Sequence, residues 1–173
     1  GSCPDAVGVT AYTATVNAAL SVLKTAKVAD ARITTIMGGV HPTFCHEELL
    51  KKNNDIIDFI VRGEGERTIK ELLDAISRKG DVSKISGLAY RDAGKTVVND
   101  DRGFLENIEE LSPAWDLFDW NDYTYFLVPN SRLAVVSLSR GCGHSCSFCS
   151  QQKFWKQTWR SRSPENFIAE IEM

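Results

Sequence analysis

The sequence contains no apolar run long enough to cross a membrane. Its apolar stretches, such as residues 133–136, are far shorter than the roughly 20 residues that a membrane-spanning helix needs. The chain also lacks an excess of charge of one sign, because 20 Lys and Arg stand against 23 Asp and Glu, giving a net charge of -3. This balance argues against a broadly basic protein that binds nucleic acid. No basic segment followed by an apolar one opens the sequence, so we expect a cytoplasmic rather than a secreted protein.

Internal repeats and low-complexity tracts are also missing from the 173 residues. Hydrophobic residues make up 43% and charged residues 25%, a mixture typical of a chain that folds around a core. The length allows one medium domain, or one small domain with an appendage. Because the sequence opens with Gly1 and Ser2 instead of Met, we expect a piece of a longer protein.

Strands and helices alternate in the first half of the chain. Apolar, partly β-branched runs predict strands at residues 6–12, 32–37 and 56–61. Apolar spacing of three and four residues predicts helices over 16–26 and 69–76, and a short helix is expected at 47–52. This order predicts an α/β fold in which parallel strands are joined by right-handed crossovers. Since three strands are few for a sheet covered on both faces, we expect one or two further strands before residue 1.

Small and polar residues follow each predicted strand. Ligands of such sheets bind outside the carboxyl ends of the strands, where glycines permit close approach and hydroxyls can form hydrogen bonds. The candidate ligand-binding residues at these ends are Thr10, Thr13, Gly38, Gly39, His41 and Glu64. Each has an alternative role. The two threonines would cap the following helix, and His41 would stabilise the turn at Pro42. Glu64 and Glu66 would be acids favoured by the dipole at a helix start.

The second half of the chain changes in character. A β-hairpin is expected at residues 88–98, where two strand-like runs flank a loop containing Gly94. Residues 99–131 are typical of a connector, and their aromatic side chains would pack on neighbouring domains or form a ligand platform. Residues 133–138 predict another strand, which leads into a cysteine-rich loop. A final helix is expected to begin with Ser163 as its N-cap.

Three of the five cysteines, Cys142, Cys146 and Cys149, fall in the pattern C-x3-C-x2-C. Thiolates crowded on one loop are typical of a soft metal ion or an iron–sulfur cluster rather than of a disulfide framework. A cluster of four irons needs four ligands and this loop supplies three, so one iron would stay open to a small molecule. A zinc ion held by the three thiolates and His144 is one alternative, and a loop without metal is another.

The cysteine loop resembles the signature loop of the radical S-adenosylmethionine (SAM) enzymes, which has an aromatic residue, here Phe148, before its last cysteine. The resemblance implies that Cys142, Cys146 and Cys149 bind a [4Fe-4S] cluster and that Phe148 lies by the adenine of SAM. In this family the open iron binds SAM, and reduction of the cluster cleaves SAM to a radical that abstracts hydrogen. The resemblance therefore also implies an external electron donor such as ferredoxin or flavodoxin.

Two upstream segments resemble the cobalamin-binding domain that precedes many radical SAM domains. They are Gly-Gly-Val-His-Pro-Thr at residues 38–43 and Val-Arg-Gly-Glu-Gly-Glu at 61–66. The resemblance implies that the candidate residues at the strand ends bind cobalamin. The hairpin at 88–98 and the segment 111–116 are similar to the usual bridge between the two domains. The Asp-x-His-x-x-Gly segment that ligates cobalt in some cobalamin domains is absent.

Residues 150–155, Ser-Gln-Gln-Lys-Phe-Trp, are most similar to the anaerobic magnesium-protoporphyrin IX monomethyl ester oxidative cyclase group. This similarity implies an oxidoreductase that closes a ring on a tetrapyrrole in (bacterio)chlorophyll synthesis. The alternatives are a cobalamin-dependent radical SAM methyltransferase and, in a different class, a non-enzymatic zinc or iron–sulfur module.

The resemblance also implies how the chain is divided. We expect a truncated flavodoxin-like cobalamin-binding domain over residues 1–80 and a hairpin with a connector over 81–131. Residues 132–173 would form the first β-α unit of a radical SAM barrel. Because a full barrel takes roughly 250 residues, we expect this chain to be inactive by itself.

Two further features have less bearing on function. Cys3 and Cys45 have no partner at ligand spacing and are expected to be ordinary thiols. Residues 140–164 contain five Lys and Arg side chains and no acid, and Phe154, Trp155 and Trp159 are interleaved with the basic residues. Such stretches can bind RNA, but in an acidic chain we favour a local role, either balancing the charge of the cluster or substrate or forming a solvated face.

Overall fold

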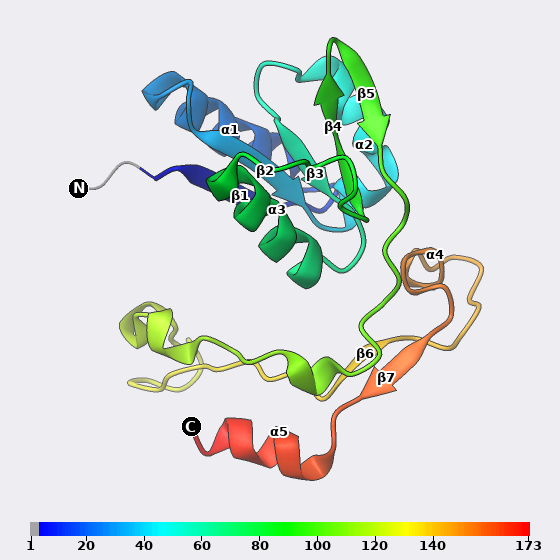
Figure 1. Ribbon diagram of the computed structural model, residues 1–173. Coiled ribbons are helices and arrows are strands. Elements are labelled where there is room, and N and C mark those ends of the chain that lie inside the picture. The colour runs from blue at the N-terminus through cyan, green and yellow to red at the C-terminus, as the bar shows by residue number, and fades with distance from the viewer. Residues whose placement is uncertain (1–3) are drawn as a thin grey trace. The chain divides into compact units, whose positions relative to one another are not determined.

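The computed structural model describes residues 4–173. These residues divide into two compact units, a first that ends at Phe104 and a second over Leu105–Met173. The first unit alternates strands and helices as the sequence predicts (Figure 1). Its elements are β1 (Ala6–Thr10), α1 (Val16–Ala29), β2 (Thr34–Gly38), α2 (Val40–Lys52), β3 (Phe59–Val61), α3 (Glu66–Arg78), β4 (Leu88–Asp92) and β5 (Lys95–Val98).

The five strands form one mixed sheet in the order β1-β2-β3-β4-β5. The first three strands are parallel, which confirms the prediction of crossover connections. The predicted hairpin also forms, because Ala93 and Gly94 both take the positive φ that a two-residue hairpin loop needs (45° and 82°). This hairpin does not stand apart from the sheet, since β4 pairs antiparallel with β3. The first compact unit therefore extends beyond residue 80 to Phe104.

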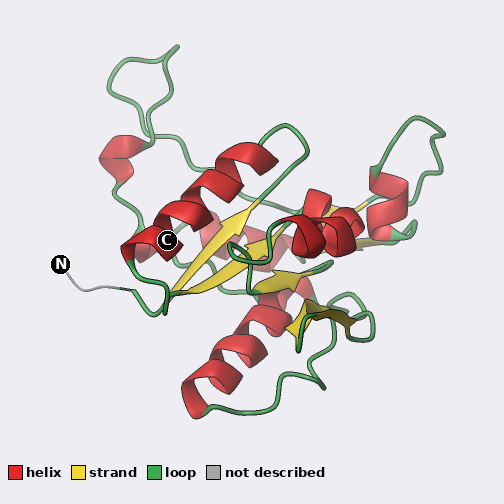
Figure 2. Cartoon of the chain, turned by 90° about the horizontal axis from the view of Figure 1, so that it is seen from above, coloured by secondary structure: helices red, strands yellow, loops and turns green. Residues whose placement is uncertain are grey.

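Helices cover both faces of this sheet (Figure 2). Met37 and Ile60 point to the side of α1 and α2, where they pack with Leu23 of α1 and Leu50 of α2. The alternate residues of the same strands belong to the opposite face, and there Ile36, Val61 and Leu88 pack with Leu72 of α3. The period of two along each strand thus produces a three-layer unit with one apolar cluster on each side of the sheet.

Helix α2 begins at Val40, well before the helix predicted at residues 47–52. Proline in the first turn of a helix removes an N–H that has no intrahelical acceptor, so Pro42 starts this helix rather than a separate turn. The backbone departs from helical geometry at Cys45, where φ is -116°. The predicted short helix is therefore only the second half of a kinked one.

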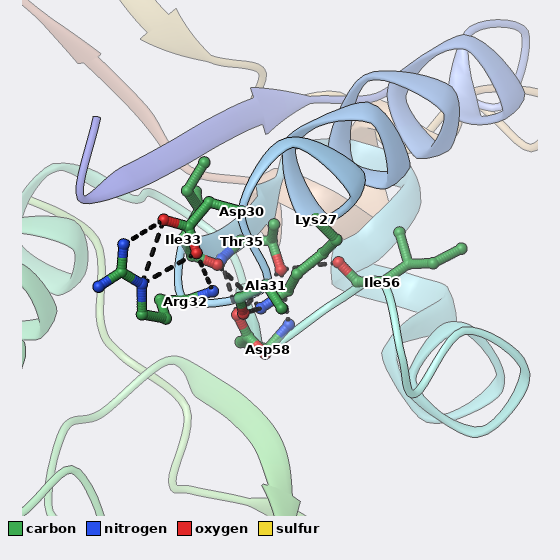
Figure 3. A network of polar contacts seen from close by, with 8 residues as sticks. All are labelled: Lys27, Asp30, Ala31, Arg32, Ile33, Thr35, Ile56 and Asp58. Atoms are coloured by element: carbon green, nitrogen blue, oxygen red, sulfur yellow. Dashed lines mark hydrogen bonds and ion pairs between the residues drawn. The ribbon is translucent and has the colours of Figure 1, made fainter. Parts of the chain in front are cut away.

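A polar network closes the amino-terminal edge of the sheet (Figure 3). Lys27 Nζ, at the end of α1, donates to Asp58 Oδ2 at 2.6 Å and to the carbonyl of Ile33 at 2.8 Å. The backbone N–H of Thr35 donates to the same carboxylate oxygen at 2.8 Å, and its hydroxyl donates to the carbonyl of Ile56 at 2.7 Å. Thr35 is fully buried, so these bonds satisfy polar groups that water cannot reach.

The second unit consists of short elements. They are the 3-10 helices Ile108–Glu110, Trp115–Leu117 and Trp120–Asp122, the strands β6 (Ser139–Gly141) and β7 (Trp159–Ser161), and the helices α4 (Gln151–Trp155) and α5 (Pro164–Ile171). The prediction for α5 is confirmed, because Ser163 is its N-cap and the hydroxyl of Ser163 accepts the N–H of Asn166 at 3.2 Å. Within residues 4–173, no helix combines the length and the apolar character needed to cross a membrane.

The prediction of a strand at residues 133–138 is wrong. This segment pairs with no strand, and side chains such as Leu133 and Val135 are exposed. Apolar residues form a strand only where another strand supplies hydrogen bonds. Here the first residue that pairs with another strand is Ser139, directly after this segment. β6 pairs antiparallel with β7, an element that the sequence did not reveal. The cysteine loop still follows a strand, as predicted.

Candidate functional site

The loops after β1 and β2 pack tightly at the carboxyl edge of the sheet. The N–H of Ala11 donates to the carbonyl of Gly38 at 2.9 Å, and the N–H of His41 donates back to the carbonyl of Ala11 at 3.2 Å. Gly39 has a φ of 103°, and a Cβ there would lie 2.6 Å from Thr10 Oγ1. Any side chain at Gly39 would therefore separate the two loops.

A side-chain contact joins the same two loops. Thr13 Oγ1 lies 3.1 Å from Nδ1 of His41, in the first turn of α2. The N-cap of α1 is Thr15, so the alternative roles of Thr10 and Thr13 as caps of this helix are wrong. His41 belongs to a helix and not to an isolated turn. The structure thus brings together Thr10, Thr13, Gly39 and His41, four of the predicted ligand-binding residues.

Thr43 connects this edge to the loop after β3. Its hydroxyl donates to the carbonyl of Gly39 at 2.8 Å and accepts the N–H of Gly63 at 3.0 Å. Gly63 has a φ of 69°, and nothing lies within 4 Å of the position where its Cβ would be. The backbone of the third loop is therefore open to close approach by a ligand. Thr43 ends the segment 38–43 singled out in the sequence but was not among the individual candidate residues, although a hydroxyl close after a glycine pair is a usable signal.

The charged residues after β3 differ in their roles. Glu64 is buried and lies before α3, whereas Glu66 is the acid of the first helical turn. Arg62 is also buried and points to the segment after β5, where it donates to Asp101 Oδ1 at 2.6 Å and to the carbonyl of Asn99 at 2.5 Å. Arg62 therefore fixes the end of β3 to the hairpin, and Glu64 is the acid that lies in the loop itself.

The second candidate site is the cysteine loop. Cys142 and Cys149 are half-buried, Cys146 is exposed, and all three are free thiols. The N–H of Cys149 donates to the carbonyl of Cys146 at 3.1 Å, so these two residues belong to one turn. Across residues 4–173, no three His, Cys, Asp or Glu side chains are gathered closely enough to hold a metal ion.

The donor set of this loop nevertheless fits an iron–sulfur cluster in chemical type. Three thiols on one loop are soft ligands, and clusters bind to thiolates. His144 is exposed. Phe148 is 91% exposed and so contacts little of the chain. Cys45 is a free thiol packed against the apolar cluster of α1 and α2, whereas Cys3 lies outside the described residues.

The residue directly before Cys142 must be a glycine for β6 and β7 to pair as they do. Gly141, the last residue of β6, has a φ of 97°, and a Cβ there would overlap the carbonyl oxygen of Thr158. The strand β7 therefore lies against the backbone directly before Cys142. The sequence does not show why a glycine precedes Cys142, because the reason is the pairing of β6 with β7.

The aromatic connector packs on itself. Trp115 lies 5.5 Å from Trp120 between ring centroids, and Phe118 lies 5.4 Å from Tyr123. A cavity of about 780 Å³ adjoins this cluster within the second unit. It is lined by Pro113, Trp115, Asp116, Trp120, Ala134, Val136, Glu170, Ile171 and Met173. Sequence reasoning did not predict this cavity.

Comparison with known proteins bears on both candidate sites. The B12 binding domain family matches residues 2–73. An anaerobic magnesium-protoporphyrin IX monomethyl ester cyclase of Rubrivivax gelatinosus is 37% identical over 98% of this chain and 31% of its own length. An uncharacterized methyltransferase of Pyrococcus horikoshii is 39% identical over 97% of this chain and 36% of its own length. The chain thus spans about a third of the curated relatives that it matches.

Solved structures share the fold. The cobalamin-dependent SAM radical enzyme OxsB, in its apo form, superposes with a TM-score of 0.74 at 21% identity, over 98% of this chain and 23% of that chain. The radical SAM methyltransferase TsrM of Kitasatospora setae, with cobalamin and a [4Fe-4S] cluster bound, superposes with a TM-score of 0.67 at 19% identity, over 98% and 35%. At these identities the likeness shows the architecture.

Proposed function

Because residues 2–73 belong to the B12 binding domain family, we propose that the carboxyl edge of the five-stranded sheet binds cobalamin. The predicted residues Thr10, Thr13, Gly38, Gly39, His41 and Glu64 supply hydroxyl, imidazole, carboxylate and backbone groups there. The open position beside Gly63 supports the proposal, since a large ligand needs bare backbone to approach. Cobalt ligation through an Asp-x-His-x-x-Gly segment is not part of this proposal, because the chain has none.

In the second unit, Cys142, Cys146 and Cys149 would hold a [4Fe-4S] cluster, and Phe148 would lie by the adenine of SAM. When bound, the cluster supplies the electron for SAM cleavage and cobalamin supplies a methyl carrier or a redox partner. The chain's own residues bind and orient these groups: the thiolates as ligands and the turn between Cys146 and Cys149 as a spacer. An external donor such as ferredoxin or flavodoxin would deliver the electron.

The proposed functional division follows these two sites. Residues 1–80 form the cobalamin-binding part, 81–131 the hairpin and connector, and 132–173 the start of the radical SAM part. In the structure the hairpin packs with the first part. The first compact unit therefore ends at Phe104, whereas the proposed cobalamin-binding part ends at residue 80.

For the whole protein we favour oxidative cyclisation of a magnesium-porphyrin ester. The observation that carries this proposal is the 37% identity to the Rubrivivax gelatinosus cyclase, which extends through both candidate sites. Cobalamin-dependent methyl transfer is the second candidate. It is favoured by the 39% identity to the Pyrococcus horikoshii methyltransferase over nearly the same residues.

The cofactor proposal is tested on the chain as it stands. Hydroxocobalamin is added, unbound cofactor is removed by gel filtration, and the retained cobalamin is measured by its visible absorption. We expect retention that Gly39→Val abolishes, because the side chain would separate the loops after β1 and β2. Gly8→Ala is the matched control, since nothing lies within 4 Å of a Cβ at that position of β1. Equal retention by the two variants would contradict a site at this edge.

The activity is tested on the longer protein that contains this sequence. The reduced, reconstituted enzyme is incubated with magnesium-protoporphyrin IX monomethyl ester and with SAM labelled in its methyl group. A product that has lost hydrogens and gained a ring supports the cyclase. Transfer of the labelled methyl group to any acceptor supports the methyltransferase instead. A colourless protein that retains zinc and no iron would contradict both.

A further inference from the structure

The side chain of Gln152 holds the backbone of the cysteine loop. Its Nε2 donates to the carbonyl of Cys146 at 3.0 Å. The same carbonyl accepts the N–H of Cys149 at 3.1 Å. A carbonyl oxygen has two lone pairs, and both are therefore engaged by groups that follow it in the chain. The two bonds define the turn that separates the thiol of Cys146 from that of Cys149.

Helix α4, which carries Gln152, is too short to be stable by its own hydrogen bonds. It is fixed instead by contacts of Trp155 at its end. The indole Nε1 donates to Gln151 Oε1 at 2.7 Å, and the guanidinium of Arg160 lies 5.6 Å from the ring centroid. Arg160 Nη1 in turn donates to the carbonyl of Leu105 at 2.6 Å, at the start of the second unit.

The chain returns from α4 to β7 by an uncommon route. Lys156 and Gln157 both have positive φ, 49° and 57°, which residues other than glycine rarely adopt. Left-handed residues in succession reverse the chain sharply and bring Thr158 and Trp159 against Gly141. The cysteine loop and α4 thus lie between β6 and β7 in the sequence, and the side chain of Gln152 links the helix to the loop through its bond to the Cys146 carbonyl.

We propose that Gln152 is a positioning residue of the cysteine loop. By donating to the Cys146 carbonyl, it holds the Cys146–Cys149 turn in the form that lets both thiols bind one ligand. The role of the turn in binding an iron–sulfur cluster rests on the function proposed above. The effect of Gln152 on the positions of the two thiols does not. The amide is required as a donor, because an ionised carboxylate of the same shape would repel the carbonyl.

The first experiment uses metal-free protein and a probe that bridges two thiols. Phenylarsine oxide is bound in a background in which Cys3, Cys45 and Cys142 are changed to Ser, and its transfer to a competing dithiol is timed. We expect transfer about fivefold faster in Gln152→Ala, the cost of one lost hydrogen bond to a neutral carbonyl. Gln152→Glu should behave like Gln152→Ala at neutral pH. Ser145→Ala, at an exposed position of the same loop, is the control and should leave the rate unchanged.

An isosteric variant separates positioning from mere packing. Gln152→Met fills nearly the same space without an N–H donor, so its rate should match that of Gln152→Ala. Rates equal to the parent in Gln152→Ala and Gln152→Met would overturn the proposal.

The second experiment repeats the comparison with iron and with all cysteines present. After anaerobic reconstitution, release of iron to a chelator should be about fivefold faster in Gln152→Ala than in Ser145→Ala. Equal release from the two variants would overturn the inference that the turn serves the cluster. If no variant takes up iron, the proposed function fails, and the arsenical rates still decide whether Gln152 positions the turn.

Discussion

Thr13 and His41 join the first two loops of the carboxyl edge, with Oγ1 of Thr13 lying 3.1 Å from Nδ1 of His41. The two residues are separated by α1 and β2 in the sequence and meet because parallel strands end at the same edge of a sheet. A partner at Nδ1 orients the ring and sets the role of Nε2, as it does for imidazoles that bind ligands elsewhere.

We therefore expect His41→Ala to weaken cobalamin binding about fivefold to tenfold, the worth of about one hydrogen bond. Thr13→Val removes only the group that orients the ring, so its effect should be smaller. Titration of each variant with hydroxocobalamin, followed by absorbance, measures both dissociation constants. Binding that is unchanged in His41→Ala would show that the imidazole is only part of the helix start.

Stability, in contrast, depends on the opposite edge of the sheet. The ammonium group of Lys27 lies 2.6 Å from Asp58 Oδ2, and both side chains are partly buried. The backbone N–H of Thr35 donates to the same carboxylate oxygen (Figure 3). Lys27→Met should lower the free energy of unfolding by about 1–3 kcal/mol, because it leaves a partly buried carboxylate without its cation. Urea unfolding measures the loss.

Lys24→Met is the matched control for this change, since Lys24 lies on the exposed face of the same helix. Cobalamin binding should be the same in both variants, because the network lies away from the ends of the strands. A loss of stability in Lys27→Met no larger than in Lys24→Met would mean that the ion pair contributes nothing.

Most strands and helices of the first unit could be predicted from the sequence because their signals are local. Apolar runs and helical spacing depend on near neighbours, and the glycines at strand ends occupy positions that the topology dictates. The start of α2 was missed because Pro42 has two meanings, a turn or a first helical turn. In the structure Pro42 lies in the first turn of α2, where the N–H of Thr43 donates to the carbonyl of Gly39 at 3.1 Å.

The second unit is harder to predict because its two strands, β6 and β7, are distant in the sequence and neither has a typical strand composition. Residues 133–138 have the composition of a strand, yet β6 is formed by Ser139, Arg140 and Gly141. These residues have weak strand preference and pair only because the chain reverses at Lys156 and Gln157. The cysteine spacing identified the candidate site, but the residues that hold the loop, such as Gln152, carry no signal outside the fold.

The start of α5 has a pH-dependent anchor. The N–H and hydroxyl of Ser163 bond to Glu109, with 2.5 Å between the N and Oε1, and they hold the pKa of Glu109 below its ordinary value of 4.5. A lowered folded-state pKa stabilises the protein fully above 4.5 and loses that effect as the pH falls through the lowered value.

Glu109→Gln should therefore make stability less dependent on pH in this acidic range, because an amide oxygen still accepts but does not titrate. The measurement is the urea midpoint from neutral pH to below 4.5. Glu106→Gln, nearby on the connector, should keep the slope of the parent protein. Parallel curves for all three proteins would refute the anchor.

Gly141 gives the sharpest test of how the cysteine loop is built. Its φ of 97° and its contact with the Thr158 carbonyl both exclude a side chain, so Gly141→Ala should separate β6 from β7. We expect a loss of about 1–3 kcal/mol in the stability of the second unit, and fewer irons retained per chain after anaerobic reconstitution.

Gly143→Ala is the control, because the nearest atom to a Cβ there is the Gln157 carbonyl oxygen at 4.0 Å. Both changes add one methyl group within the same short segment, and only the first meets a neighbouring strand. If Gly143→Ala loses as much iron as Gly141→Ala, the loop is sensitive to any added side chain, and the strand pair before Cys142 is not what holds it.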